Sequence, residues 1–246
     1  PKTPPPPPPV RLITIVAIVA LLIVASVAIW TIGIPRSQPN PRVVPFTTLA
    51  GAERGPVFSP DGAQLAYTAN EKGGPFLFVA IVNGGEPLQL THTPGVQNAA
   101  WSPDSTRIAF LRQTKDGQSV FIIPALGGEE RRLTTLLSPR PGLSWANDRA
   151  VVIVDRSSPL DSDALFLVST ETGERTRLTR PSGGPGDRLP RLSPDERTVA
   201  FVRSFSNQIV GDVYIVPTAG GEAQQVTTVQ WAIFDLDWSA DGKWIV

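Results

Sequence analysis

The chain has 246 residues with no cysteine, no methionine and one histidine, and its 22 basic and 22 acidic side chains cancel. The lack of cysteine excludes disulfides and thiolate chemistry. Four basic residues precede Val43, so the remaining chain carries 18 basic against 22 acidic side chains, the opposite of the basic footprint that nucleic-acid binding requires.

Residues 1–11 are rich in proline, with an unbroken run from Pro4 to Pro9. Such a run favours a stiff polyproline II conformation. We interpret residues 1–11 as a juxtamembrane linker, and a docking site for a proline-recognising partner is the alternative. Because the chain begins with Pro1 and stops at Val246 within a strand pattern, we expect both ends to be cut from a longer reading frame.

Residues 12–34 hold no charged side chain and are rich in Ile, Val, Ala and Leu. As a helix, 23 residues extend roughly 34 Å, enough to cross a hydrocarbon core of about 30 Å. A signal peptide is the rival interpretation, but the apolar stretch is long and prolines precede it instead of a basic region. The sequence therefore predicts one transmembrane α-helix over 12–34, followed by a linker at 35–42. Basic residues flank the segment on both sides and leave its orientation open.

From Val43 to Val246 the sequence repeats with a period of 43 to 48 residues, which is typical of propeller blades. One marker is an aromatic residue or Leu followed by Ser-Pro-Asp-Gly or a variant. It recurs at 58–62, 101–105, 145–149, 192–196 and 238–242. A second marker begins at a glycine turn and ends in Leu-Thr or Val-Thr, at 84–91, 127–134, 173–179 and 220–227.

Each repeat reads as four short antiparallel strands. The first marker ends an inner strand and makes a tight turn, where Pro sets φ, Asp bonds the backbone and Gly tolerates positive φ. A β-rich run such as 107–110 returns, a third strand follows, and the glycine turn opens the fourth. No helical period intervenes, so the sequence predicts an all-β propeller of four-stranded blades over 43–246.

The propeller is expected to be incomplete, with four blades and the start of a fifth. Residues 46–49 (Phe-Thr-Thr-Leu) occupy the place of a fourth strand but have no blade before them. In a closed ring they would complete the last blade as a clasp. We expect six or more blades in the intact protein, and we expect 43–246 alone to aggregate because an open ring leaves an unpaired edge.

The repeats resemble the TolB-type, WD-like propeller repeat over about four-fifths of the chain. The proline-rich spacer, the single apolar segment and residues 45–62 together resemble bacterial membrane-bound regulators of the CadC-like kind. The resemblance implies a cytoplasmic winged-helix DNA-binding domain before the helix and a periplasmic propeller after it. The same anchor and propeller follow a Ser/Thr protein kinase domain in some bacterial receptors.

The sequence predicts no catalytic, cofactor-binding or metal-binding residue. His92 is the lone histidine and is interpreted as a structural or surface residue, and Gly183–Gly186 as an ordinary loop because no helix follows. The turn aspartates recur in every clear copy of the first marker and are interpreted as turn caps: Asp61, Asp104, Asp195 and Asp241. Asp235 and Asp237 alternate along an inner strand and are expected to face the central channel, with a cation site as the less favoured alternative.

Three functions remain open from the sequence. The favoured one is an extracytoplasmic sensor or interaction propeller of a bacterial inner-membrane, single-pass regulator, binding an unknown protein or small molecule. DNA would be bound only through a domain missing from this chain, and dimerisation is expected because one helix signals mainly by association or rotation. The alternatives are the receptor part of a Ser/Thr kinase and the propeller of a prolyl-oligopeptidase-like hydrolase.

Overall fold

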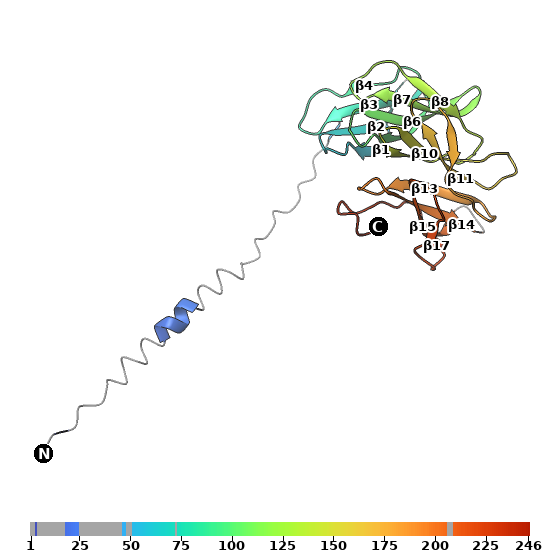
Figure 1. The fold of residues 1–246 in the computed structure, drawn as a ribbon. Helices are drawn as coiled ribbons and strands as arrows, with labels where there is room; N and C mark the ends of the chain where they lie inside the picture. Colours follow the sequence, from blue (N-terminus) through green and yellow to red (C-terminus); the bar gives the residue numbers. More distant parts are fainter. Residues whose placement is uncertain (1–2, 4–17, 25–45, 48–50, 72, 206–208) are drawn as a thin grey trace. The chain divides into compact units, whose positions relative to one another are not determined.

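The computed structural model describes residues 3, 18–24, 46–47, 51–71, 73–205 and 209–246 (Figure 1). The chain divides into two units, Pro1–Phe46 and Thr47–Val246. In the first unit residues 18–24 are helical, and their apolar side chains are exposed. No helix among the described residues is long and apolar enough to cross a membrane. Most of the predicted span 12–34 and nearly all of both linkers lie outside the described residues, so the span stays a prediction.

The second unit contains four antiparallel sheets in chain order. The first holds β1 (Glu53–Phe58), β2 (Gln64–Glu71), β3 (Gly74–Ile81) and β4 (Leu88–Gln89). The second holds β5 (Val96–Trp101), β6 (Arg107–Thr114), β7 (Gly117–Pro124) and β8 (Arg131–Thr135). The third holds β9 (Leu143–Asn147), β10 (Ala150–Asp155), β11 (Ala164–Ser169) and β12 (Arg175–Arg177). The fourth holds β13 (Gly186–Leu192), β14 (Thr198–Ser204), β15 (Val210–Pro217) and β16 (Gln224–Gln225), with β17 (Trp231–Ala232) also paired to β15.

Each sheet is one blade, because its four strands pair in sequence order and each sheet corresponds to one repeat. The all-β, four-stranded blade predicted from the 43–48-residue period is therefore confirmed. The start of a fifth repeat is present as an isolated bridge between Trp238 and Ile245. Phe46 and Thr47 are not in a strand, and residues 48–49 lie outside the described residues, so the clasp stays a prediction.

Most of the hydrophobic core lies between blades, and one further cluster lies within the first sheet. One cluster joins the first and second sheets, a second joins the second and third, and a third joins the third and fourth. The second strand of a blade is thus covered on both faces, and Val151, Val152, Ile153 and Val154 of β10 are all fully buried. This two-sided burial explains why these strands are continuous apolar runs instead of alternating polar and apolar residues.

The turn is built as the sequence predicted in the four copies of the first marker that keep the serine and the aspartate. In the first blade the Ser59 hydroxyl donates to the Asp61 carboxylate at 2.5 Å and accepts from the Gln64 amide at 2.9 Å, while Asp61 also accepts from the Ala63 amide. The same set of bonds recurs at Ser102, Ser193 and Ser239. The turn-cap interpretation of the four aspartates is therefore confirmed.

The threonine of the second marker also has a physical role. Its hydroxyl accepts a hydrogen bond from an amide of the third strand at 2.9 Å in three blades: Thr91 from Leu77, Thr179 from Leu165 and Thr227 from Val213. In the second blade Thr134 instead pairs with Val120 through the backbone. A threonine two residues past the end of the last strand thus satisfies an amide that short outer strands leave without a ladder partner.

Candidate functional site

A cavity of about 970 Å³ lies among the inner strands of the second unit. It is lined by parts of β1, β5, β9 and β13, by the turns that follow them and by the start of the fifth repeat. Prolines and aromatic residues form much of the wall, including Pro56, Trp101, Pro141, Trp145 and Phe234. The repeat therefore places one inner strand of every blade against a shared space.

The inner strands are bent where they pass the cavity. Register shifts occur in β1 between Arg54 and Val57, in β5 between Gln97 and Ala99, and in β13 between Arg188 and Arg191. A left-handed residue sits in each shift: Gly55 with φ 58°, Asn98 with φ 40° and Leu189 with φ 54°. Such bulges re-aim the side chains beside them, and a branched residue such as Leu189 adopts this conformation only where the surrounding structure imposes it.

Tryptophan side chains tie the cavity wall together across blades. The Trp101 indole donates to the Val57 carbonyl at 2.9 Å, and the Trp145 indole donates to the Ala100 carbonyl at 2.8 Å. The Trp238 indole donates to the Arg191 carbonyl at 3.1 Å in the same way. Each of these hydrogen bonds joins the tryptophan of one repeat to the inner strand of the preceding blade. The same bond therefore holds the cavity wall together from blade to blade.

Asp235 and Asp237 both line the cavity, but the inner strand along which they were expected to alternate is not formed, because the last strand, β17, ends at Ala232. The Asp235 carboxylate is engaged by Arg191 at 2.6 Å and accepts from the Leu236 amide, while Asp237 accepts from the Trp238 amide. Among the described residues no group of three or more His, Cys, Asp or Glu side chains is placed to hold a metal ion. The polar-lining interpretation of the two aspartates fits this geometry better than the cation site does.

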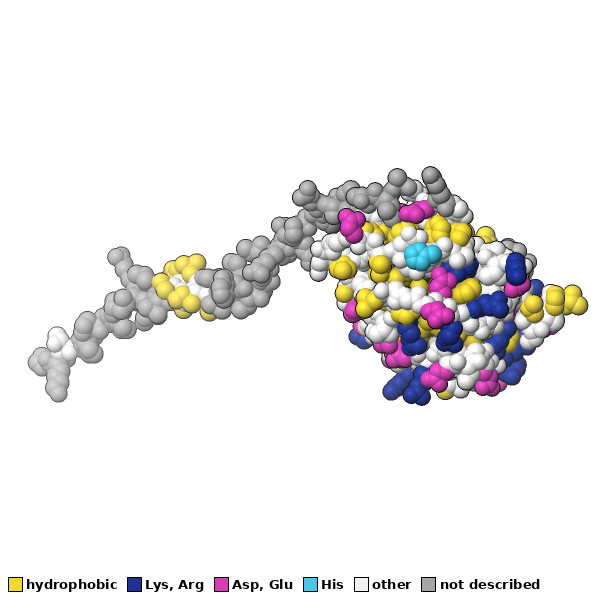
Figure 2. Space-filling model, turned by 90° about the horizontal axis from the view of Figure 1, so that it is seen from above, with side chains coloured by type: hydrophobic (Ala, Val, Ile, Leu, Met, Phe, Trp, Pro, Cys, Tyr) yellow, Lys and Arg dark blue, Asp and Glu magenta, His cyan; other side chains and the backbone are white. Residues whose placement is uncertain are grey.

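The remaining sequence candidates lie away from the cavity. His92 is exposed, and Figure 2 shows the one histidine side chain on a face where basic, acidic and apolar groups are mixed. Gly183–Gly186 lead into strand β13 rather than a helix, as predicted. Gly186 has φ 97°, and an added Cβ would lie 2.1 Å from the Asp163 carbonyl oxygen. This glycine permits a close approach between the third and fourth blades.

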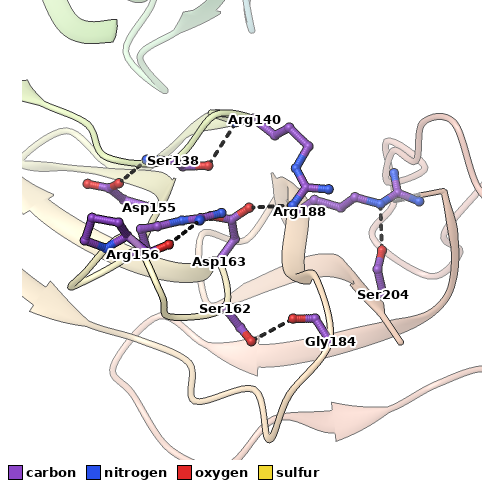
Figure 3. Close-up of polar contacts among 10 residues, drawn as sticks. Ser138, Arg140, Asp155, Arg156, Ser162, Asp163, Gly184, Arg188 and Ser204 are labelled. Atoms are coloured by element: carbon purple, nitrogen blue, oxygen red, sulfur yellow. Dashed lines mark hydrogen bonds and ion pairs between the residues drawn. The ribbon is translucent and has the colours of Figure 1, made fainter. Parts of the chain in front are cut away.

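A cluster of arginines at one mouth of the cavity has no counterpart in the sequence motifs. Arg140 and Arg188 line the cavity from neighbouring blades. Arg140 contacts the Asp163 carboxylate at 3.3 Å, and Arg156 binds the same carboxylate at 2.7 Å (Figure 3). Asp163 is almost fully buried, so one carboxylate serves two guanidinium groups.

Arg188 is held by neutral acceptors. Its Nε donates to the Ser204 hydroxyl at 3.0 Å, and its Nη2 donates to the Ile209 and Ile233 carbonyls at 2.7 Å each (Figure 3). It makes no ion pair with a carboxylate of the described residues. Burial, and after it the charge of Arg140, lowers the pKa of the Arg188 guanidinium from its ordinary value.

The loop that carries Arg140 is held in place by hydrogen bonds to the Asp155 carboxylate. The buried Asp155 carboxylate accepts from the Leu137 amide at 2.7 Å and from the Ser138 amide at 2.8 Å. The Ser138 hydroxyl in turn accepts from the Arg140 amide at 3.0 Å. The buried Asp155 at the end of β10 therefore positions Arg140 through Ser138. The signal of this in the sequence was a single aspartate at the end of the apolar run 150–154.

Comparison with known proteins places these features in a family. The TolB β-propeller domain profile matches residues 54–210. TolB from Acinetobacter baumannii superposes with a TM-score of 0.67 at 18% identity, over 79% of this chain and 48% of TolB. A prolyl endopeptidase superposes with a TM-score of 0.55 at 15% identity, over 77% of this chain and 31% of that one.

One curated relative is similar in sequence. The uncharacterized peptidase YuxL of Bacillus subtilis (strain 168) is 33% identical over 82 residues, which are 33% of this chain and 12% of YuxL. The chain thus spans less than half the length of both TolB and YuxL. The two structural likenesses concern the fold, whereas the profile match covers more than half of the chain. This chain belongs to the TolB β-propeller domain family.

Proposed function

We propose that this chain is the interaction propeller of a membrane-anchored protein and that a segment of a partner polypeptide binds in the cavity among the inner strands. The cavity carries the proposal. Its volume of about 970 Å³ lies at the upper end of the roughly 300 to 1,000 Å³ of ordinary ligand pockets. Walls of proline and tryptophan with a few placed charges suit an extended peptide, which offers apolar side chains and backbone polar groups together.

The cavity is also pre-formed, which favours binding. The indole bonds of Trp101, Trp145 and Trp238 fix successive inner strands, and the buried Asp155 fixes the loop before β9. Ordering these elements costs nothing at the moment of association, so more of the contact energy appears as affinity.

Anchoring to a membrane rests on the sequence of residues 12–34. The segment is uncharged, long enough to span as a helix, and bracketed by Arg11 and Arg36. The resemblance to CadC-like regulators, rather than the anchor itself, supports a propeller on the periplasmic side of a bacterial inner membrane. Carbonate washing of membranes from cells that make the chain tests the anchor: the chain is expected in the pellet, and a variant lacking 12–34 in the supernatant. Release of the unmodified chain by carbonate would contradict the anchor.

The kind of signalling domain that the intact protein carries is a separate proposal. A winged-helix transcription regulator and a Ser/Thr kinase receptor are both compatible with a propeller that binds a partner outside and a domain that responds inside. Family resemblance supports the regulator more closely, through the spacer, the apolar segment and residues 45–62.

Binding in the cavity is tested with a plugged variant. A pool of acetylated hexapeptides of random sequence is passed over the immobilised full chain in detergent micelles. Ser144 lines the cavity and is half-exposed, so Ser144→Trp fills the space, whereas Leu126 is 83% exposed and lies outside it. Retention by the unmodified chain and by Leu126→Trp, with loss in Ser144→Trp, is the expected result. Equal retention by all three proteins, or by none, would overturn the proposal.

A second candidate function is the substrate-gating propeller of a serine peptidase. It is favoured by the likeness of 82 residues to the uncharacterized peptidase YuxL and by the shared fold with a prolyl endopeptidase. The catalytic domain would then lie outside this chain. Labelling of the natural protein by a fluorophosphonate, which reacts with an activated serine, decides between the two: no labelling is expected of an interaction propeller, and stoichiometric labelling is expected of a peptidase.

A further inference from the structure

The charges that line the cavity are separated between its two mouths. Arg191 is neutralised by Asp235 at 2.6 Å, and Asp237 lies beside Trp238 near the turn end of the inner strands. Glu196 lies in the turn after β13, also at that end. Arg140 and Arg188 lie at the opposite end, where the inner strands begin. The two wall arginines that have no acidic partner in the wall, Arg140 and Arg188, therefore lie at the entrance, away from Asp237 and Glu196.

Positive charge at the entrance exceeds what the nearby carboxylate neutralises. Asp163 is shared by Arg140 and Arg156, and Arg188 bonds only to a hydroxyl and two carbonyls among the described residues. Two guanidinium groups thus share one buried carboxylate, whereas the Arg188 guanidinium is directed toward Ser204 (Figure 3) and binds no carboxylate of the described residues. Partly buried cations in such excess are costly unless an anion joins them.

The two cavity arginines are also held in place with donors to spare. Arg140 uses only Nη2 toward Asp163, and Arg188 uses Nε and Nη2, among the described residues. Each guanidinium therefore keeps N–H groups for a ligand. A guanidinium presents a planar fork that matches the two oxygens of a carboxylate.

We propose that Arg140 and Arg188 form the carboxylate-binding end of the cavity and hold the C-terminal carboxylate of the bound peptide segment. This inference rests on the proposed function, because it names which part of the peptide the cavity recognises. The peptide then runs from the two arginines past Trp101 and Trp145 toward the turn mouth, where Asp237 favours a neutral or basic residue. The proposal identifies the partner as a chain whose free C-terminus is accessible.

The test compares two peptide pools on the full chain in detergent micelles. One pool of acetylated hexapeptides has free C-termini, and the second has the same composition with C-terminal amides. Charge-assisted bonds of this kind predict roughly 10- to 100-fold stronger retention of the free acids. Arg140→Gln is expected to abolish the preference, and it is structurally mild because Asp163 keeps both bonds from Arg156 at 2.9 and 2.7 Å.

One control variant and a second test variant keep the outcomes separate. Arg132→Gln removes an exposed ion pair with Asp116, outside the cavity lining, and is expected to keep the preference. Arg188→Lys retains the charge but loses the fork, and is expected to weaken the preference. Equal retention of both pools overturns the carboxylate site while the proposed function stands. An Arg140-dependent rise in melting temperature with inorganic phosphate, without retention of either pool, overturns the peptide and leaves a phosphate site.

Discussion

The fifth residue of the first marker, which directly follows the aspartate of the Ser-Pro-Asp turn, offers a sharp test of how the repeat is built. The backbone there is left-handed in four copies, with φ of 70° at Gly62, 59° at Ser105, 60° at Glu196 and 68° at Gly242. A non-glycine residue in this conformation destabilises the fold by about 1 to 2 kcal/mol. Glycine avoids that strain but destabilises the fold by about 0.5 to 1 kcal/mol, because it has more conformational entropy in the unfolded state. Glu196 is exposed, and its carboxylate makes no hydrogen bond to a described residue. Glu196→Gly is therefore expected to stabilise the fold by about 0.5 to 1 kcal/mol.

Urea unfolding followed by tryptophan fluorescence measures this change in the free energy of unfolding. Gly62→Ala is the matched control, because an added Cβ at Gly62 meets no atom within 4 Å and adds conformational cost alone. It is expected to destabilise by about 1 kcal/mol, and the two changes are expected to add because they lie in different blades. A Glu196→Gly protein no more stable than the unmodified chain would refute the reasoning.

Three further predictions concern the repeated contacts. Trp145→Phe loses the indole bond to a backbone carbonyl at 2.8 Å and is expected to cost about 1 to 3 kcal/mol by urea unfolding, whereas Trp244→Phe, at a side chain 70% exposed, should cost little. Thr179→Val leaves a buried amide of the third strand without its hydrogen-bond acceptor and should lower the free energy of unfolding by about 1 to 3 kcal/mol. Thr134→Val, where the backbone supplies the pairing, should lower it clearly less. Equal losses in the two variants would contradict the role assigned to the threonine hydroxyl. The Asp195 pKa is held below its ordinary 3.8 by the hydroxyl of the turn serine and then by a backbone amide, so its stabilisation is present above about pH 4 and lost as pH falls through the lowered pKa. Carboxyl NMR titration of Asp195 at or above 3.8 would contradict that assignment.

The blade was predictable from sequence because its signals are local. Five copies of the turn marker, spaced by one blade, located the inner strands, and the hydrogen bonds of Ser59 and Asp61 explain why those residue types recur. The degenerate copy follows the same rule, since Asn147 accepts from the Arg149 amide where an aspartate would otherwise cap the turn.

The arginine entrance was not predictable for the opposite reason. Arg140 and Arg188 are far apart in the chain and line one cavity only because the third and fourth blades pack against each other. Their positions depend on Asp155 and Asp163, which are buried by tertiary packing, and on a bulge at Leu189 that opposes the preference of leucine. Sequence periodicity specifies which residues line a channel but not which charges remain without partners there.

The central claim is that the propeller lies outside a membrane that residues 12–34 cross, and a topology reporter tests it most directly. Alkaline phosphatase, which is active only after export, and green fluorescent protein, which fluoresces after folding in the cytoplasm, are each fused after Val246 and expressed in bacteria. The account predicts an active phosphatase fusion and a dark fluorescent fusion, with both results reversed when 12–34 is deleted. A bright fluorescent fusion with inactive phosphatase would place the propeller in the cytoplasm and contradict the account.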